Sequence, residues 1–248
     1  MPDHLTTPQG RRIAYEFRAG HGPGVVFLGG YRSDMTGSKA AHLQDWADRT
    51  GRAFLRFDYS GHGASSGAFE NGGIGDWSAD ALAVILALTK GPQVLVGSSM
   101  GGWIALLVAR AVPDRVAGLV GVAAAPDFTE DLMLATFTPD QKNALQTHGF
   151  VEEPSEYSEQ PNRITQAFLD DGAKHLALRS PLSLPFPVRL LQGSADIDVP
   201  PFVAQKLFDH ATCPDMRMVL VKGADHRFST PDCLELMIQT VEEVLSHA

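Results

Sequence analysis

Short apolar runs alternate with longer helical patterns along most of this chain, and that alternation limits its possible folds more than any other feature. Residues 24–30 (GVVFLGG) are apolar at successive positions, as expected of a strand that is buried on both faces, and residues 93–97 (QVLVG) form another predicted strand. We expect further strands at 11–17, 53–58, 116–126, 187–193 and 216–223, and helices near 38–49, 76–90, 103–112, 201–210 and from about 231. This order predicts an α/β protein with a mostly parallel central sheet and helices on both faces.

The alternation stops after Pro126. Residues 127–185 are more charged, and they show helical patches without a strong strand pattern. We therefore predict a single domain over residues 1–248, with a core formed by 1–126 and 186–248 and a small helical lid inserted at 127–185. Six apolar side chains of the insertion either line a site below the lid or pack the lid against the core: Met133, Leu134, Phe137, Phe150, Phe168 and Leu169.

Charge and hydropathy argue against several classes of function. The formal net charge is -9 at pH 7, and no block of lysine and arginine is present. Both observations argue against a nucleic-acid surface and against docking to anionic membranes. The longest apolar runs, such as 81–88, are much shorter than the roughly 20 residues of a membrane span. Residues 1–16 lack the basic-then-apolar order of a secretory leader, so a cytoplasmic protein is expected.

The stretch VLVGSSMGGW (94–103) contains the pattern G-x-S-x-G between a predicted strand and a predicted helix. Glycines on both sides of a serine let the backbone turn so tightly that the serine side chain protrudes at the end of the sheet. The register makes Ser99 the candidate nucleophile, and Ser98 is then expected to be buried or locally hydrogen-bonded. The pattern alone is a weak signal, because glycine and serine are common in turns.

A serine hydroxyl needs a neighbouring base to act as a nucleophile near neutral pH. His226 follows the last predicted strand, in a loop before the terminal helix, and is the best candidate among the nine histidines. His62 is the rival with the most plausible position, although its flanking glycines suggest a turn with a structural role.

The base in turn needs an acceptor on its second nitrogen, which fixes its tautomer. Asp196 follows the strand at 187–193 and is the preferred candidate, with Asp198 as its nearest competitor. Asp225 is adjacent to the base in sequence, but neighbouring loop side chains usually diverge. The chain order of nucleophile, acid and base then agrees with the α/β-hydrolase architecture.

A Gly-Gly loop follows the early strand, within FLGGYRSD (27–34). Its backbone could stabilise an oxyanion through the N–H of Tyr31, together with the N–H of Met100 after the nucleophile. Gly29 and Gly30 would keep the loop close to the reacting atoms, and Gly30 is a candidate for substrate contact. Taken alone, such a turn after a strand is common and carries little information.

Several stretches together resemble the serine α/β-hydrolase superfamily over nearly the whole chain. FLGGYRSDMTGSKA, RFDYSGHGASSG, LVGSSMGGW, RLLQGSADIDVP and DHR are similar to the α/β hydrolase domain-containing protein 10 family, as is SEYSEQ around Tyr157 in the insertion. That family is known for mitochondrial acyl-protein thioesterase and mycophenolic acid acyl-glucuronide esterase activity. The resemblance implies Ser99 as nucleophile, Asp196 as acid and His226 as base.

The resemblance also implies a small-molecule acyl ester or thioester as substrate. Tyr157 and Arg163 of the insertion are candidate substrate contacts, Arg163 for a carboxylate such as that of a glucuronic acid. Hydrolysis would proceed through an acyl-enzyme. Because the base must be neutral to accept a proton, activity should rise through roughly pH 6–8.

No metal or other cofactor is predicted, because the histidines show no H-x-x-x-H spacing and the two cysteines no C-x-x-C spacing. Two other enzymatic interpretations remain open within the same fold, a general carboxylesterase and a cofactor-free perhydrolase. A hydrolase-like module that binds without catalysis is the alternative from a different class. The oligomeric state is not predicted.

Overall fold

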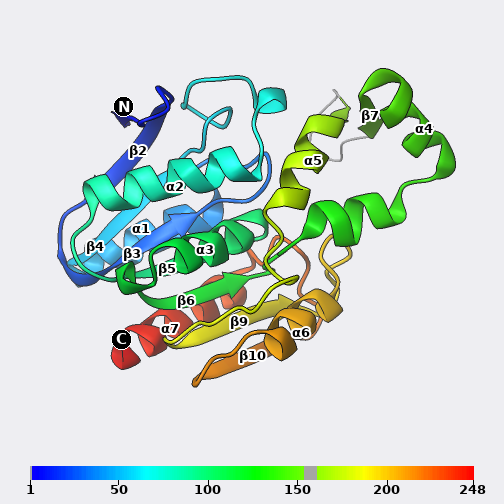
Figure 1. Cartoon of the computed structure of the whole chain (residues 1–248). Helices are drawn as coiled ribbons and strands as arrows, with labels where there is room; N and C mark the ends of the chain where they lie inside the picture. Colours follow the sequence, from blue (N-terminus) through cyan, green and yellow to red (C-terminus); the bar gives the residue numbers. More distant parts are fainter. Residues whose placement is uncertain (1, 154–160) are drawn as a thin grey trace.

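A mixed sheet forms the centre of the molecule in this computed structural model, which describes residues 2–153 and 161–248 (Figure 1). Its strands are β1 (Asp3–Thr6), β2 (Arg12–Arg18), β3 (His21–Leu28), β4 (Arg52–Phe57), β5 (Gln93–Ser98), β6 (Val116–Val122), β9 (Val188–Gly193) and β10 (Met216–Val221). They lie in the order β1-β2-β4-β3-β5-β6-β9-β10. Only the β1–β2 and β2–β4 pairs of this sheet are antiparallel, so the predicted α/β fold with a mostly parallel sheet is confirmed.

Helices cover both faces of the sheet, as the alternation predicted (Figure 1). On one face lie α1 (Ser38–Thr50) and α7 (Pro231–His247), and on the other lie α2 (Ile74–Leu88), α3 (Met100–Ala111) and α6 (Pro201–His210). Each face has its own cluster of buried apolar side chains, with Trp77 and Trp103 fully buried in one and Trp46 buried in the other. Between these layers β5 is buried at every position, which explains the apolar run VLVG at its centre.

The interval between β6 and β9 holds the elements of the predicted lid. They are a π-helical turn (Thr129–Leu134), α4 (Pro139–His148), β7 (Phe150–Glu153), β8 (Asn162–Thr165) and α5 (Gln166–Lys174). The antiparallel pair β7–β8 was not predicted, because strands of four residues are too short to show an alternating pattern. Figure 1 shows α4, β7 and α5 beyond the side of the sheet toward which the arrows of β6 and β9 point.

A buried aspartate joins the two ends of this interval. Asp127 lies in the segment that follows β6 and has a φ of 58°; its carboxylate accepts hydrogen bonds from the backbone N–H groups of Ala177 (2.6 Å) and Leu178 (2.9 Å). The guanidinium of Arg179 approaches the same carboxylate at 3.3 Å. These contacts join the segment after β6 to the segment after α5, so the two ends of the interval lie side by side. The division into core and lid remains a prediction.

The helix after the glycine-rich stretch begins earlier than the sequence suggested. Residues 103–112 were expected to be helical, whereas α3 runs from Met100 to Ala111 and includes Gly101 and Gly102. Glycine lowers helix propensity by about 1 kcal/mol relative to alanine, so these residues argued against helix locally. Close packing nevertheless requires them, because a methyl group at Gly101 would overlap the carbonyl oxygen of Leu28 and one at Gly102 would lie 2.5 Å from Cβ of Ala124.

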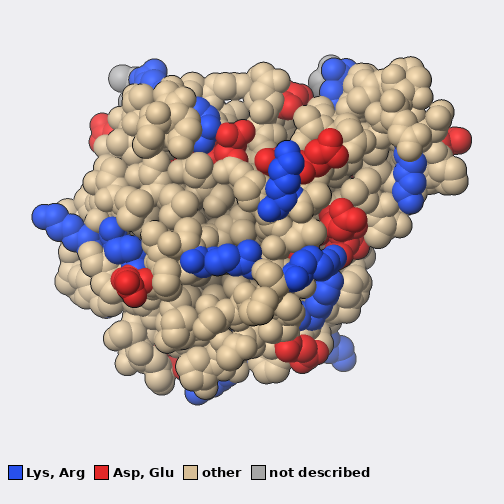
Figure 2. Space-filling view, viewed as in Figure 1, with Lys and Arg blue, Asp and Glu red and all other residues tan. Residues whose placement is uncertain are grey.

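Acidic and basic side chains are interspersed over the face shown in Figure 2, and the described part of that face shows no continuous basic area. Among the described residues, no helix is both long and apolar enough to span a membrane.

Candidate active site

Ser99 occupies a strained position at the junction of β5 and α3. Its φ of 54° and ψ of -121° lie in a region that non-glycine residues rarely adopt, and such residues cluster at functional sites. A methyl group at Gly97 would lie 2.5 Å from the carbonyl oxygen of Gly101, and one at Gly101 would overlap the carbonyl oxygen of Leu28. The flanking glycines therefore allow a turn that side chains at these positions would block.

Two hydrogen bonds join the side chains of Ser99, His226 and Asp196. The Nε2 atom of His226 lies 3.0 Å from Oγ of Ser99, and its Nδ1 atom lies 2.9 Å from Oδ2 of Asp196. Three separate loops supply these residues, after β5, β9 and β10, and all three loops follow carboxyl ends of parallel strands. The structure thus brings together the predicted nucleophile, base and acid in the order that acyl transfer requires.

The carboxylate of Asp196 is fully buried and accepts hydrogen bonds on both oxygens. Oδ1 accepts from the backbone N–H groups of Asp198 (3.1 Å) and Val199 (2.8 Å), while Oδ2 accepts from Nε2 of Gln192 (2.9 Å) as well as from His226. These donors compensate for the burial of a charge and hold the carboxylate in one orientation. Sequence reasoning missed Gln192, since a glutamine inside a strand carries no signal of this contact.

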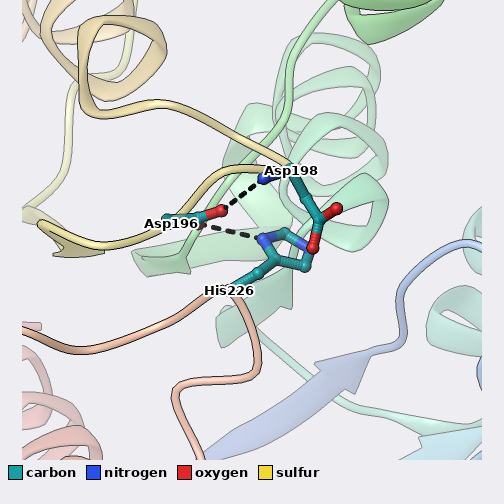
Figure 3. A group of neighbouring side chains, drawn as sticks. All are labelled: Asp196, Asp198 and His226. Atoms are coloured by element: carbon teal, nitrogen blue, oxygen red, sulfur yellow. Dashed lines mark hydrogen bonds and ion pairs between the residues drawn. The ribbon is translucent and has the colours of Figure 1, made fainter. Parts of the chain in front are cut away.

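Asp198, the competing acid, lies on the solvent-exposed side of the same loop. Figure 3 shows its carboxylate directed toward the His226 ring, while Asp196 contacts Nδ1 of that ring. Ligand atoms of Asp196, Asp198 and His226 lie within 4.8 Å of one another, a grouping with donor types suited to a divalent cation. Both oxygens of Asp196 are already engaged, however, so the donor set favours the hydrogen-bonded arrangement.

The two remaining candidates, Ser98 and His62, take no part in the hydrogen bonds between Ser99, His226 and Asp196. Ser98 is buried as the last residue of β5. Nδ1 of His62 contacts the carbonyl oxygen of Ser60, and the ring packs against those of Tyr59, Phe69 and Trp77. Burial lowers the pKa of His62 to about 4, so this histidine is neutral near neutral pH.

The Gly-Gly loop after β3 passes directly beside the nucleophile. A methyl group at Gly30 would lie 3.4 Å from Cβ and 4.0 Å from Oγ of Ser99. Met100 is the first residue of α3, and a helix leaves its first N–H groups without intrahelical partners. Tyr31 follows Gly30 in the chain and Met100 follows Ser99, so both backbone N–H groups belong to residues next to the reacting hydroxyl. Their part in an oxyanion hole stays a prediction.

Two pockets meet at Ser99 and His226. One, here called the lid pocket, has a volume of about 490 Å³. Its lining is mainly apolar and includes Ala125, Phe128, Leu132, Met133, Phe137 and Val199. The other, here called the polar pocket, has a volume of about 450 Å³ and includes Arg32, Ser33, Ser38, Lys39, Arg227 and Ser229. Tyr31 lines both pockets.

The six apolar residues expected of the lid have different surroundings. Met133 and Phe137 line the lid pocket, whereas Phe168 and Leu169 are buried in the core cluster. Leu134 lines a separate hollow beside Lys142, and the ring of Phe150 lies against the guanidinium of Arg163.

Arg163 lines neither of the two pockets. Its guanidinium pairs with Glu152 at 2.7 Å and lies 4.2 Å from the ring centroid of Phe150. Its proposed contact with a substrate carboxylate stays a prediction. Tyr157 lies outside the described residues.

Comparison with known proteins agrees with this geometry. Residues 21–235 match the family described as the alpha/beta hydrolase family. The chain belongs to the alpha/beta hydrolase family. Over 244 residues it is 36% identical to the mitochondrial palmitoyl-protein thioesterase ABHD10 of Bos taurus, covering 97% of this chain and 79% of that protein. The human protein of the same name is 35% identical, with the same coverage.

Two solved structures extend this similarity within the alpha/beta hydrolase family to three dimensions. The crystal structure of a protein from Agrobacterium vitis S4 superimposes on this chain with a TM-score of 0.95. The two sequences are 40% identical, and the match covers 99% of this chain and 98% of that one. The structure of mouse alpha/beta hydrolase domain-containing protein 10 has a TM-score of 0.91 and 33% identity, with the same coverage. The family resemblance found in the sequence is therefore confirmed.

Proposed function

We propose that this alpha/beta hydrolase cleaves acyl thioesters and acyl esters through an acyl intermediate on Ser99. The observation that carries the proposal is the continuous chain of hydrogen bonds from Asp196 through His226 to Ser99, which ends at the mouth of an apolar pocket. The names of the ABHD10 relatives support a palmitoyl thioester as one substrate class.

In the first half of the proposed cycle, Oγ of Ser99 attacks the acyl carbonyl while Nε2 of His226 accepts its proton. Asp196 holds the ring through Nδ1 and stabilises the imidazolium that forms. The developing oxyanion lies beside the amides of Tyr31 and Met100, where preorganised donors lower the barrier. His226 then gives its proton to the departing thiol or alcohol.

In the second half, water enters from the polar pocket and His226 accepts one of its protons. The resulting hydroxide attacks the acyl-serine, and as the tetrahedral intermediate collapses, His226 returns the proton to Oγ of Ser99 and the acid is released. The lid pocket keeps the acyl chain against Phe128, Met133 and Phe137 throughout. Burial of a methylene contributes about 0.8 kcal/mol, so longer chains should bind more tightly until the pocket is filled.

A fluorophosphonate probe and intact-mass measurement test this proposal. The wild-type protein should become labelled on Ser99, and rapid mixing with an acyl thioester should show a mass increase of one acyl group. Ser99→Ala should show neither, while Ser98→Ala should retain both. A wild-type protein that is folded, unlabelled and inactive would instead indicate the non-catalytic binding module.

Matched substrates separate the remaining enzymatic alternatives. A panel with one acyl group attached as thioester, aryl ester and acyl glucuronide should show the highest kcat/KM for the thioester. Equal rates for all three would favour a general carboxylesterase. Peracid formation from a carboxylic acid and hydrogen peroxide would favour the perhydrolase.

The cytoplasmic location expected from the sequence remains a proposal, and it agrees with the free thiols of Cys213 and Cys233. Fractionation of cells that produce the full chain would test it.

A further inference from the structure

The two pockets at Ser99 differ in charge as well as in polarity. Three basic residues, Arg32, Lys39 and Arg227, line the polar pocket, where Asp34 is the acidic one. The carboxylate of Asp34 is turned to its own loop, because Oδ1 accepts hydrogen bonds from the backbone N–H (2.8 Å) and the hydroxyl of Thr36 (2.5 Å). The lining of the polar pocket therefore has more basic than acidic side chains.

The lid pocket has the opposite character. Besides its apolar lining it carries two acidic residues, Glu153 and Asp198, and no basic side chain other than His226 among its described lining. An acyl chain fits this pocket, while a negatively charged group there would face two carboxylates. If the acyl chain occupies the lid pocket, the polar pocket, which shares Ser99 and His226 with it, offers space for the leaving group.

Lys39 is a basic residue of the polar pocket that is hydrogen-bonded to the loop of His226. It belongs to the first turn of α1, and its ammonium donates a hydrogen bond to the carbonyl oxygen of Arg227, the residue after His226. This partner is a neutral carbonyl, so the hydrogen bond leaves the positive charge of Lys39 in place. Burial lowers the pKa of Lys39 to about 8, an effect that the nearby carboxylate of Asp225 opposes, and the amine is mainly charged at neutral pH.

Arg32 also lines the polar pocket, and its guanidinium contacts two aromatic rings. Its guanidinium lies 4.1 Å from the ring centroid of Phe69 and 5.8 Å from that of Tyr31, and its distance to the carboxylate of Glu70 is 3.7 Å. Ser33, Ser38 and Ser229 line the same pocket. Hydroxyls and cations together are the groups that bind carboxylates and phosphates in proteins.

We propose that the polar pocket binds leaving groups that carry negative charge, and that Lys39 is the residue that selects them. This inference rests on the proposed function, since it assigns the leaving-group side of the same reaction. The anionic group can be a carboxylate or a phosphate on the departing thiol, and both would meet the same ammonium. Because a negative charge near the ammonium is favourable both before and after the carbonyl is attacked, the effect should appear mainly in KM.

Thioesters that differ only in charge test this inference. Octanoyl N-acetylcysteine carries a carboxylate that octanoyl N-acetylcysteamine lacks, and the octanoyl thioester of 2-mercaptoethyl phosphate carries a phosphate that the 2-mercaptoethanol thioester lacks. At low salt and pH 7, we expect kcat/KM to be about tenfold higher for each anionic partner, the size of one charge-assisted hydrogen bond. The two pairs show whether carboxylate, phosphate or both are accepted.

Variants of Lys39 identify the residue responsible. In Lys39→Met the anionic-to-neutral ratio should fall close to one, and in Lys39→Arg most of the ratio should remain. Lys90→Met removes an equal charge at an exposed site outside the polar pocket and should keep the wild-type ratio. If Lys39→Met does not fold, rising ionic strength should lower the wild-type ratio, because salt screens the attraction.

Three outcomes are distinguishable. If Lys39 acts only by holding the loop of His226, Lys39→Met slows both members of each pair equally, and the inference is overturned. Equal wild-type rates for charged and neutral thioesters overturn it while leaving the proposed function intact. Absence of both thioester hydrolysis and Ser99 labelling overturns the proposed function and the inference with it.

Discussion

Nε2 of His226 lies 3.0 Å from Oγ of Ser99, although the two residues are separated by 127 positions in the chain. The contact is possible because β5 and β10 belong to one sheet whose parallel strands end on the same side. Ser99 is presented by a strained turn and His226 by a loop, and Asp196 holds the ring from its other nitrogen. The rigid sheet therefore supplies the alignment that proton transfer between distant residues requires.

Replacing the nucleophile should abolish nearly all activity without affecting the fold. For Ser99→Ala we expect turnover to fall by about 10⁴–10⁶-fold, as is typical when a triad member is lost. Removal of a hydroxyl that is half-exposed should leave the midpoint of urea unfolding nearly unchanged. Ser98→Ala is the matched control, and a comparable loss there instead of at Ser99 would contradict the register of the turn.

The two aspartates of the acid loop should respond very differently to the same change. Asp196→Asn should lower kcat by about 10⁴-fold, because the amide no longer holds His226 in the tautomer that accepts the serine proton. Asp198→Asn should lower kcat by less than about tenfold, since the side chain does not bond to Nδ1. Steady-state kinetics on one thioester suffices, and the reverse ranking would identify Asp198 as the acid.

Enlarging a residue of the lid pocket should shift the acyl-chain preference. Met133→Trp fills space beside Phe128 and Phe137, so kcat/KM should fall for long acyl chains and change little for butyryl or hexanoyl thioesters. Leu134→Trp alters the adjacent residue, which lines a different hollow, and should retain the wild-type chain-length profile. Identical profiles for both variants would place the acyl chain elsewhere.

The preference for anionic leaving groups should depend on pH. The ammonium of Lys39 is charged below its pKa of about 8 and neutral above it, so the anionic-to-neutral ratio of kcat/KM should decline from pH 7 to pH 9. Asp225, Arg227 and Cys233 face the same amine, and Asp225 counteracts part of the lowering of its pKa. Lys39→Arg should show a flat ratio over this range, and a wild-type ratio that rises with pH would contradict the assignment.

Local patterns were sufficient to predict the sheet and the residues that meet at its edge. Buried parallel strands have continuous apolar sequences, and their carboxyl ends gather on one side whatever the loops contain. For that reason Ser99, Asp196 and His226 could be placed together from their positions after three strands. The choice of Asp196 over Asp198 also agrees with the contact to Nδ1 in the structure.

Contacts made by residues without such positional signals required the folded chain. Gln192 lies inside a strand and Lys39 in a helix, and neither sequence context shows that the first donates to Asp196 or that the second lies beside the loop of His226. The antiparallel pair β7–β8 and the division of space around Ser99 into an apolar and a cationic pocket likewise arise from segments distant in sequence. Periodicity reports which face of an element is buried, whereas a pocket depends on the side chains that several elements bring to one point in space.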